Sequence, residues 1–192
     1  AAIVVQDLNK SFGQFPAVQG VEFCVDAGKI FGLLGPNGAG KSTIISMLSC
    51  LLQPTKGEAW IMGHSILHEP MAVKAAIGVV PQEIALYEDL SARENLEFWT
   101  KLYDLRGNHI RARVDEVLDI IGLADRQKGK VIKYSGGMKR RLNIGIALLH
   151  RPDVIIMDEP TVGIDPQSRR NILDTIVDLK NHSRTILHSG GN

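Results

Sequence analysis

Two glycine-rich turns contain the residues of this chain that are best suited to bind phosphate. The first is Gly35-Pro36-Asn37-Gly38-Ala39-Gly40-Lys41-Ser42, which is followed by Thr43. Its glycines let the backbone turn tightly, so that several N–H groups and the start of the next helix converge on one anion. Lys41 adds a positive charge for the outer phosphates, and Ser42 offers a hydroxyl to Mg²⁺. This turn therefore predicts a nucleotide site.

The second turn is Ser135-Gly136-Gly137, which precedes an expected helix over residues 138–149. Its N–H groups and its hydroxyl can meet an anion along the helix dipole. Many phosphate-binding proteins have the first turn alone. The second turn narrows the choice of protein class, because it lies upstream of the apolar run 154–157 and an acid pair, an order that suggests an active site shared between two subunits.

An acid pair, Asp158 and Glu159, follows the apolar run 154–157. We expect Asp158 at the carboxyl end of a buried strand, where α/β sheets bind their ligands, and in a position to hold Mg²⁺. Glu159 is suited to act as a general base that deprotonates an attacking water. The alternative is that Glu159 only caps a helix or forms a salt bridge.

The elements that must position these residues follow from the hydrophobic pattern. Residues 29–34 form an apolar run that ends at the first glycine turn, and residues 43–52 have a helical pattern, which gives strand, loop and helix. Alternating residues at 3–8 and 17–25 predict a small antiparallel layer. Further strands suited to burial on both faces are expected at 77–80, 154–157 and 185–187. We therefore predict an α/β fold with a mainly parallel sheet.

A helical insertion is expected at about 85–135. Ser91 and Glu94 have the spacing of a capping box, and a second helical pattern runs from Ile110 to Ile121 and stops at Gly122. The remaining parts, 1–84 and 136–192, would then form the ATP-binding core of a single domain.

The composition excludes several classes of protein. With 22 basic and 21 acidic residues, the net charge of +1 gives no indication of binding to nucleic acid or to an anionic membrane. No signal peptide is expected, and the apolar runs are far shorter than the ~20 residues of a spanning helix. Cys24 and Cys50 are interpreted as reduced, buried thiols.

Taken together, the chain resembles the ATP-binding cassette family over nearly its whole length. The residues from Gly35 to Thr43 match the Walker A motif, those from Tyr134 to Met138 the signature motif, and those from Val154 to Glu159 the Walker B motif. Residues 79–82 are similar to the Q-loop, and residues 163–166 to the D-loop. The signature and D-loop are most similar to those of ABC-2-type exporters of drugs and lipids. The resemblance implies a P-loop NTPase fold with ATP and Mg²⁺ as ligands.

The resemblance also implies roles for individual residues. Phe12 occupies the place where the family stacks an aromatic ring on adenine; the alternative is a core phenylalanine. Gln82 would contact Mg²⁺ and the attacking water, or it is simply a glutamine at a strand end. Asp165 would cap the next helix and act across a dimer interface, whereas capping alone is the alternative. The basic run 139–141 is interpreted as a solvated helix face.

Two departures from the family pattern stand out. Tyr134 and Met138 replace the usual leucine and glutamine of the signature, although the Ser-Gly-Gly core is unchanged. By the usual register, the switch histidine falls near Gly191, and His188 comes three residues early. The C-terminal elements are therefore expected to be truncated.

The resemblance predicts the ATP-hydrolysing subunit of an exporter at the cytoplasmic face of the cell membrane, as a peripheral protein. Its partners would be a second copy, bound head to tail, and an integral membrane permease that docks near residues 82–90. One alternative is a soluble ABC ATPase of DNA repair or translation, and another is a nucleotide-binding module with impaired hydrolysis. The sequence disfavours a P-loop GTPase, because residues 9–12 lack the acid of a guanine-reading Asn-Lys-x-Asp motif and precede the phosphate loop.

Overall fold

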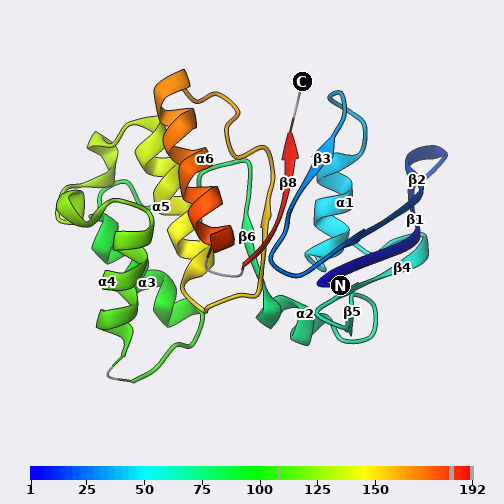
Figure 1. The fold of residues 1–192 in the computed structure, drawn as a ribbon, viewed down its shortest axis with the longest axis horizontal. Helices are drawn as coiled ribbons and strands as arrows, with labels where there is room; N and C mark the ends of the chain where they lie inside the picture. Colours follow the sequence, from blue (N-terminus) through cyan, green and yellow to red (C-terminus); the bar gives the residue numbers. More distant parts are fainter. Residues whose placement is uncertain (108, 182–183, 191–192) are drawn as a thin grey trace. The chain divides into compact units, whose positions relative to one another are not determined.

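The computed structural model of the protein describes residues 1–107, 109–181 and 184–190. The chain forms two compact units. The first contains Ala1–Val79, Pro152–Glu159 and Lys180–Asn192, and the second contains Val80–Arg151 and Pro160–Leu179. Figure 1 gives the order of the elements along the chain. The sequence of the first unit predicts mainly strands, with a helix after the first glycine turn, whereas that of the second predicts mainly helices.

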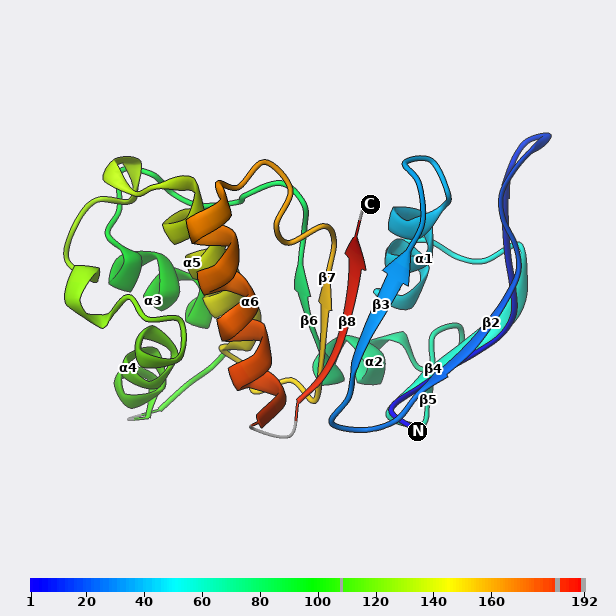
Figure 2. The ribbon, with the colours of Figure 1, turned by 45° about the horizontal axis from the view of Figure 1, so that its top comes forward.

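The first unit contains the predicted parallel sheet, with the strands in the order β3-β8-β7-β6. These strands are β3 (Ile30–Leu34), β8 (Thr185–Gly190), β7 (Val154–Met157) and β6 (Ile77–Val80). The β3–β8 and β7–β8 pairs are parallel, and Figure 2 shows these three strands side by side. All residues of β7 are buried, which explains why its sequence is continuously apolar.

The first unit also contains the antiparallel sheet, in the order β2-β1-β4-β5. Its strands are β1 (Ile3–Phe12), β2 (Phe15–Val25), β4 (Lys56–Ile61) and β5 (His64–Ser65). Helices α1 (Lys41–Leu48) and α2 (Pro70–Ala76) belong to the same unit. Apolar side chains of β1, β4 and α1 are buried in one core cluster with residues of β7 and β8. This shared core holds both sheets together.

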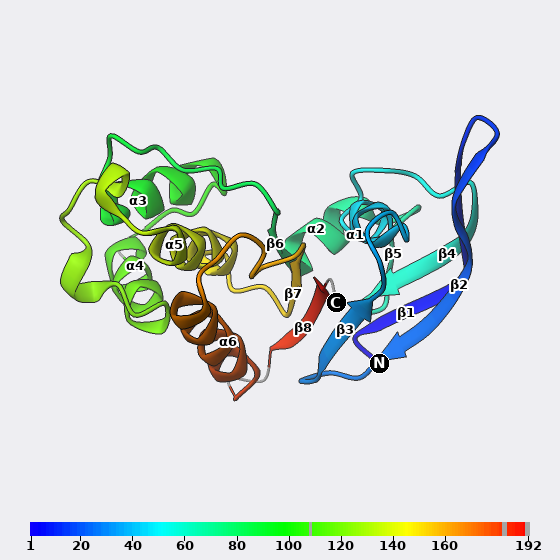
Figure 3. The ribbon, with the colours of Figure 1, turned by 90° about the horizontal axis from the view of Figure 1, so that it is seen from above.

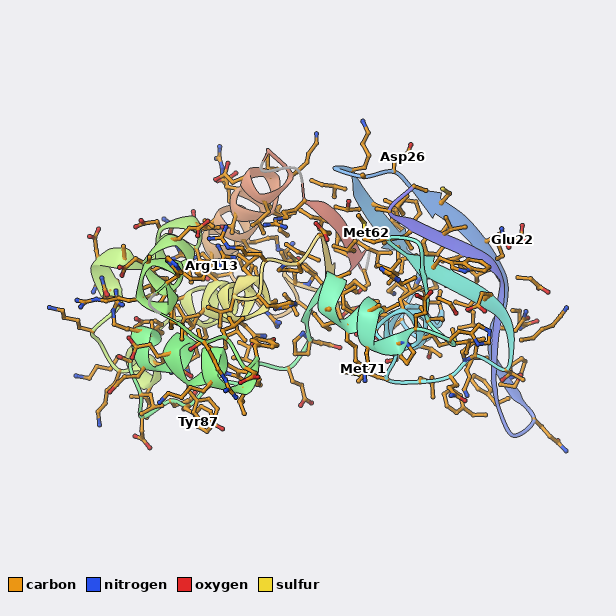
Figure 4. All side chains as sticks on the ribbon, turned by 90° about the horizontal axis from the view of Figure 1, so that it is seen from below. Glu22, Asp26, Met62, Met71, Tyr87 and Arg113 are labelled. Atoms are coloured by element: carbon orange, nitrogen blue, oxygen red, sulfur yellow. The ribbon has the colours of Figure 1, made fainter. Side chains whose placement is uncertain are left out.

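In its described residues the second unit has four α-helices, which Figure 3 shows from above. They are α3 (Ala92–Leu102), α4 (Ile110–Ile120), α5 (Gly136–Leu148) and α6 (Pro166–Asn181), with short 3₁₀ turns at Ala124–Arg126 and Val131–Lys133. The predicted capping box at the start of α3 is present, with both reciprocal bonds between Ser91 and Glu94. Arg113, labelled in Figure 4, is buried in α4, and its Nε donates to the Leu149 carbonyl at 3.0 Å.

The fold class predicted from the sequence is confirmed, with differences at element ends. Helix α1 begins at Lys41 and α5 begins at Gly136, so each helix includes residues that were expected in the preceding loop. The prediction that both cysteines are buried was wrong: Cys24 is exposed and Cys50 is only half-buried. Cys24 lies between Phe23 and Val25 on β2, and its side chain faces solvent. Within the described ranges, no helix has the length and apolar character needed to cross a membrane.

Candidate active site

The two charged segments of the first unit meet because of the strand register. In the parallel pairs, Leu34 lies opposite Gly190, and Met157 lies opposite His188. The loops that leave β3 and β7 therefore emerge at the same edge of the sheet. This edge carries Lys41, which begins α1 directly after the first loop, and the Asp158-Glu159 pair directly after β7.

Lys41 is folded back onto its own loop. Its ammonium donates to the carbonyl oxygens of Gly35 at 2.6 Å and Pro36 at 3.0 Å, and its Nζ lies 4.0 Å from Oε1 of Glu159. The side chain is only 8% exposed, so these oxygens supply the partners that a buried cation requires. The N–H groups of the Lys41 ammonium can also donate to a phosphate oxygen, which is a stronger acceptor than a carbonyl.

The loop can approach β2 closely because its last residue is glycine. Gly40 has a φ of +80°, and a Cβ at this position would lie 2.5 Å from the Ala17 carbonyl oxygen. Both the left-handed backbone and this contact exclude a larger residue. Gly40 therefore fixes the distance between the loop and β2 at the start of α1.

The acid pair is held by a residue that the sequence pattern did not single out. Oδ1 of Asp158 accepts a hydrogen bond of 2.7 Å from the Ser189 hydroxyl, and the backbone N–H of Glu159 donates to the same hydroxyl at 2.8 Å. Ser189 lies on β8, beyond the apolar run that identified this strand. A buried serine that follows such a run at the site edge is the signal that could have revealed it.

The oxygen atoms at this edge suit Mg²⁺. Mg²⁺ usually takes one or two carboxylates together with substrate phosphates, rather than an all-protein cage. Ser42, in the first turn of α1, and Asp158 provide a hydroxyl and a carboxylate in one unit. Among the described residues, no cluster of three or more His, Cys, Asp or Glu side chains could hold a metal by itself. The donors therefore fit a magnesium ion that arrives with a nucleotide.

Phe12 lies at the tip of the β1–β2 hairpin and is not a core residue. It pairs with Phe15 across the hairpin and is 51% exposed, so the core alternative is wrong. The ammonium of Lys10 lies over its ring, 5.4 Å from the centroid. β2 leads from this hairpin to Ala17, which adjoins Gly40. Phe12 is thus an accessible aromatic ring on a hairpin that contacts the phosphate loop.

In the second unit, the structure brings the signature turn and the D-loop together. Ser135 caps α5, because its hydroxyl accepts the Met138 N–H at 3.2 Å. A Cβ on Gly137 would lie 2.4 Å from the Cβ of Ser168, so a glycine is required where α5 meets the first turn of α6. Asp165 caps α6 through a 2.9 Å bond from the Ser168 N–H. Hydrogen bonds from Ser168 hold the pKa of Asp165 below its ordinary value.

Gln82 is exposed, and its backbone is fixed by a residue that was misinterpreted from the sequence. Arg140 is 3% exposed, and its guanidinium donates to the carbonyl oxygens of Pro81 at 2.7 Å and Gln82 at 2.5 Å. Burial lowers the pKa of Arg140. The interpretation of 139–141 as a solvated face was therefore wrong for Arg140. The two residues beside Arg140 also contact protein groups. Lys139 forms an ion pair with Glu88, and Arg141 donates to the carbonyls of Ile121 and Gly122.

Of the two positions considered for the switch histidine, His188 and Gly191, the structure describes only His188. His188 is half-buried within β8, opposite Gly32 of β3 and Met157 of β7, and does not lie in the loop beyond the strand. The expected switch position, Gly191, lies outside the described residues. Among the predicted catalytic and metal-binding residues, Lys41, Asp158 and Glu159 lie close together in the first unit.

Comparison with known families decides what this site belongs to. Residues 18–162 match the model of the family described as "ABC transporter". The chain belongs to this family. The match contains the Walker A, signature and Walker B segments that were identified above, and it covers elements of both compact units.

Two curated relatives illustrate the similarity. The linearmycin resistance ATP-binding protein LnrL of Bacillus subtilis is 50% identical over 184 residues, which cover 96% of this chain and 59% of LnrL. The daunorubicin resistance ATP-binding protein DrrA3 of Streptomyces coeruleorubidus is 41% identical over 186 residues, which cover 97% of this chain and 59% of DrrA3. This ABC chain therefore spans about 59% of the length of these relatives.

A solved ABC structure has the same fold. CbiO1 of Clostridium perfringens, described as part of the ABC transporter complex cbiONQ, superposes with a TM-score of 0.91 at 27% sequence identity. The superposition covers 100% of this chain and 78% of CbiO1. The parallel sheet, antiparallel layer and helical subdomain are thus those of an ABC cassette.

The Gly40 contact gives a prediction about stability. Gly40→Ala should lower the free energy of unfolding of this ABC cassette by about 2–4 kcal/mol, because it combines a left-handed backbone with a steric clash. Gly38→Ala is the control: φ is +84° there, but a Cβ would meet no atom within 4 Å, so the loss should be about 1–2 kcal/mol. Urea unfolding measures both. Equal losses would show that the Ala17 contact carries no cost.

A second prediction concerns Arg140. Arg140→Ala should lower the free energy of unfolding by about 2–3 kcal/mol, because the carbonyls of Pro81 and Gln82 lose a charged donor and a buried side chain is removed. Lys139→Ala is the neighbouring control, since its pair with the exposed Glu88 side chain should contribute less than about 1 kcal/mol. Hydrogen exchange of residues 80–84 should accelerate only in the Arg140 variant. Unchanged exchange there would contradict the assignment.

Proposed function

We propose that this chain is the ATP-binding and ATP-hydrolysing subunit of an ABC exporter, and that hydrolysis drives substrate movement through a separate membrane subunit. The observation that carries the proposal is the convergence of Lys41 and Glu159 at one edge of the parallel sheet, with Nζ and Oε1 4.0 Å apart. The names of LnrL and DrrA3, both drug-resistance proteins, support the export direction.

The nucleotide would bind along the loop from Gly35 to Thr43. Backbone N–H groups of this loop and the start of α1 would bind the phosphates, and Lys41 would exchange its carbonyl partners for phosphate oxygens. Phe12 would stack on the adenine, because its ring is exposed and stacking requires only a flat π face. Ser42, Asp158 and Gln82 would hold Mg²⁺, which supplies positive charge against the phosphates.

In the proposed reaction, Glu159 accepts a proton from the attacking water. The water oxygen forms a bond to the γ-phosphorus in line with the bond to the ADP oxygen, which breaks. Lys41 and the loop N–H groups stabilise the charge on the transferred phosphoryl group. Gln82 helps to orient the water. The products are ADP and phosphate.

The signature turn would act on the nucleotide of a second copy. Ser135 accepts the Met138 N–H through its oxygen, so its hydroxyl proton can still be donated to a γ-phosphate. Gly136 is exposed and leaves the start of α5 open to this anion, and Gly137 lets this turn pack closely on α6. Asp165 would lie at the same interface, because Gly137 packs against Ser168 in the helix that Asp165 caps. The proposed assembly is a head-to-tail homodimer.

The membrane partner would dock on the segment before α3. Tyr87 is exposed and labelled at the periphery in Figure 4, and its ring packs on Phe98 with 4.7 Å between centroids. The buried Asn95 side chain holds the Tyr87 backbone through two hydrogen bonds. Oδ1 of Asn95 accepts the Tyr87 N–H at 2.9 Å, and Nδ2 of Asn95 donates to the Tyr87 carbonyl at 3.0 Å. This segment, whose backbone Asn95 holds at Tyr87, would receive a permease loop, which would place the subunit at the cytoplasmic face of the membrane.

The functional division of the chain is also a proposal. We infer an ATP-binding core from residues 1–84 and 136–192 and a helical subdomain from residues 85–135. The compact units group residues by packing instead, and they put α5 and most of α6 with the other helices. No nucleic acid is expected among the partners.

The catalytic role of Glu159 gives a direct test. In the full-length protein, Glu159→Gln should leave ATP binding intact, lower kcat by at least about 100-fold and favour a trapped dimer, because the amide cannot accept the proton. The exposed carboxylate of Glu69, which pairs with His64, provides the control Glu69→Gln. Phosphate release and ATP binding measure both variants. Undiminished turnover in Glu159→Gln would remove Glu159 as the base.

A mixed-dimer experiment tests the shared site. A Lys41→Ala chain and a Ser135→Ala chain should each be inactive as homodimers. Mixed dimers contain one composite site with both defects and one with neither, so they should recover up to about half of the activity per dimer. Mixed dimers without any recovered activity, or a Ser135→Ala homodimer with full activity, would contradict the head-to-tail arrangement.

A further inference from the structure

One buried hydroxyl contacts both acidic residues of the Walker B segment. Ser189 is 1% exposed, and its Oγ donates to Oδ1 of Asp158 at 2.7 Å while it accepts the Glu159 N–H at 2.8 Å. It thus touches the side chain of one acid and the backbone of the next. A hydroxyl is suited to this position because it can donate and accept at the same time.

The Glu159 backbone needs such support. Its φ is +45°, in the left-handed region that non-glycine residues adopt at a cost. A backbone of this kind persists when the surrounding contacts over-determine it. The bond from the Glu159 N–H to Ser189 is one such contact, and it fixes the direction in which the Glu159 side chain leaves the chain, toward Lys41.

The position of Ser189 in the sheet gives this contact its rigidity. β8 lies between β3 and β7, and parallel ladders bind it on both sides. Ser189 is paired with Leu33 of β3, close to where the phosphate loop begins. A side chain anchored in a central strand therefore ties the acid pair to the strand that leads into the phosphate loop.

We propose that Ser189 is a positioning residue for the hydrolysis step. It orients the Asp158 carboxylate and holds Glu159 in its left-handed conformation, so that the metal ligand and the general base have a fixed relation to each other. The inference rests on the proposed function, because Ser189 would act on hydrolysis only through Asp158 and Glu159. Residues that support metal-binding carboxylates in this way usually contribute about 10- to 100-fold to activity.

The first test separates positioning from binding in the full-length protein. Ser189→Ala should lower kcat for ATP by about 10- to 100-fold and change KM by less than about threefold, because the phosphate loop is untouched. Ser189→Thr, which keeps the hydroxyl and suits a strand, should restore most of kcat.

The chain offers a matched control in Ser65. This serine is 5% exposed, and its hydroxyl likewise donates to a carboxylate, that of Glu58 at 3.2 Å, and accepts backbone N–H groups, those of Leu67 and His68. It belongs to the antiparallel sheet, so Ser65→Ala should leave kcat within about twofold of the parent at temperatures where both proteins are folded. An equal loss of kcat in both serine variants would show a general effect of destabilisation and would overturn the proposal.

A second measurement does not depend on turnover. Amide hydrogen exchange at Glu159 should be at least about tenfold faster in Ser189→Ala than in the parent, because its N–H loses a buried acceptor. Unchanged exchange would overturn the proposed contact even if Ser189→Thr failed to fold. Unchanged kcat in Ser189→Ala beside an active parent would overturn the Ser189 proposal alone. Absence of ATP hydrolysis by the parent would instead overturn the proposed function, and the role of Ser189 in hydrolysis with it.

Discussion

The parallel pairing of β3, β8 and β7 is the constraint on which the site of this ABC cassette depends. Because the strands run in the same direction, the phosphate loop after β3 and the acid pair after β7 emerge at one edge. A shift of one residue in this register would turn the side chains of β8 to the opposite face, and Ser189 would lose both acids. The 4.0 Å separation of Lys41 and Glu159 therefore depends on the backbone hydrogen bonds that pair these strands.

In the helical unit, α5 has the corresponding organising role. Its first turn carries the Ser135 cap and the Gly137 contact with α6, and its second turn carries Arg140, which holds the carbonyls of Pro81 and Gln82. One rigid helix therefore connects the signature turn, the D-loop helix and the Q-loop backbone. A displacement of α5 would therefore be transmitted to all three segments.

Local sequence patterns predicted the parts of the fold that depend on local physics. The continuous apolar run of β7, the glycine turn before α1 and the capping box of α3 each specify their structure within a few residues. Ser189 and Arg140 were missed or misinterpreted because their partners lie about 30 and 58 residues away in the sequence, so only the folded chain shows them. The exposure of Cys24 was missed for a similar reason, since a strand pattern does not show which face of β2 is covered.

We propose that Lys41 and the Walker B acids at this sheet edge form the nucleotide site. The decisive measurement is a crystal structure of the full-length Glu159→Gln protein with ATP and Mg²⁺. In that structure Lys41 should leave the carbonyls of Gly35 and Pro36 for the phosphate oxygens, with Mg²⁺ near Ser42 and Asp158. A triphosphate bound elsewhere, or a Lys41 that keeps its carbonyl partners while ATP is bound, would contradict it.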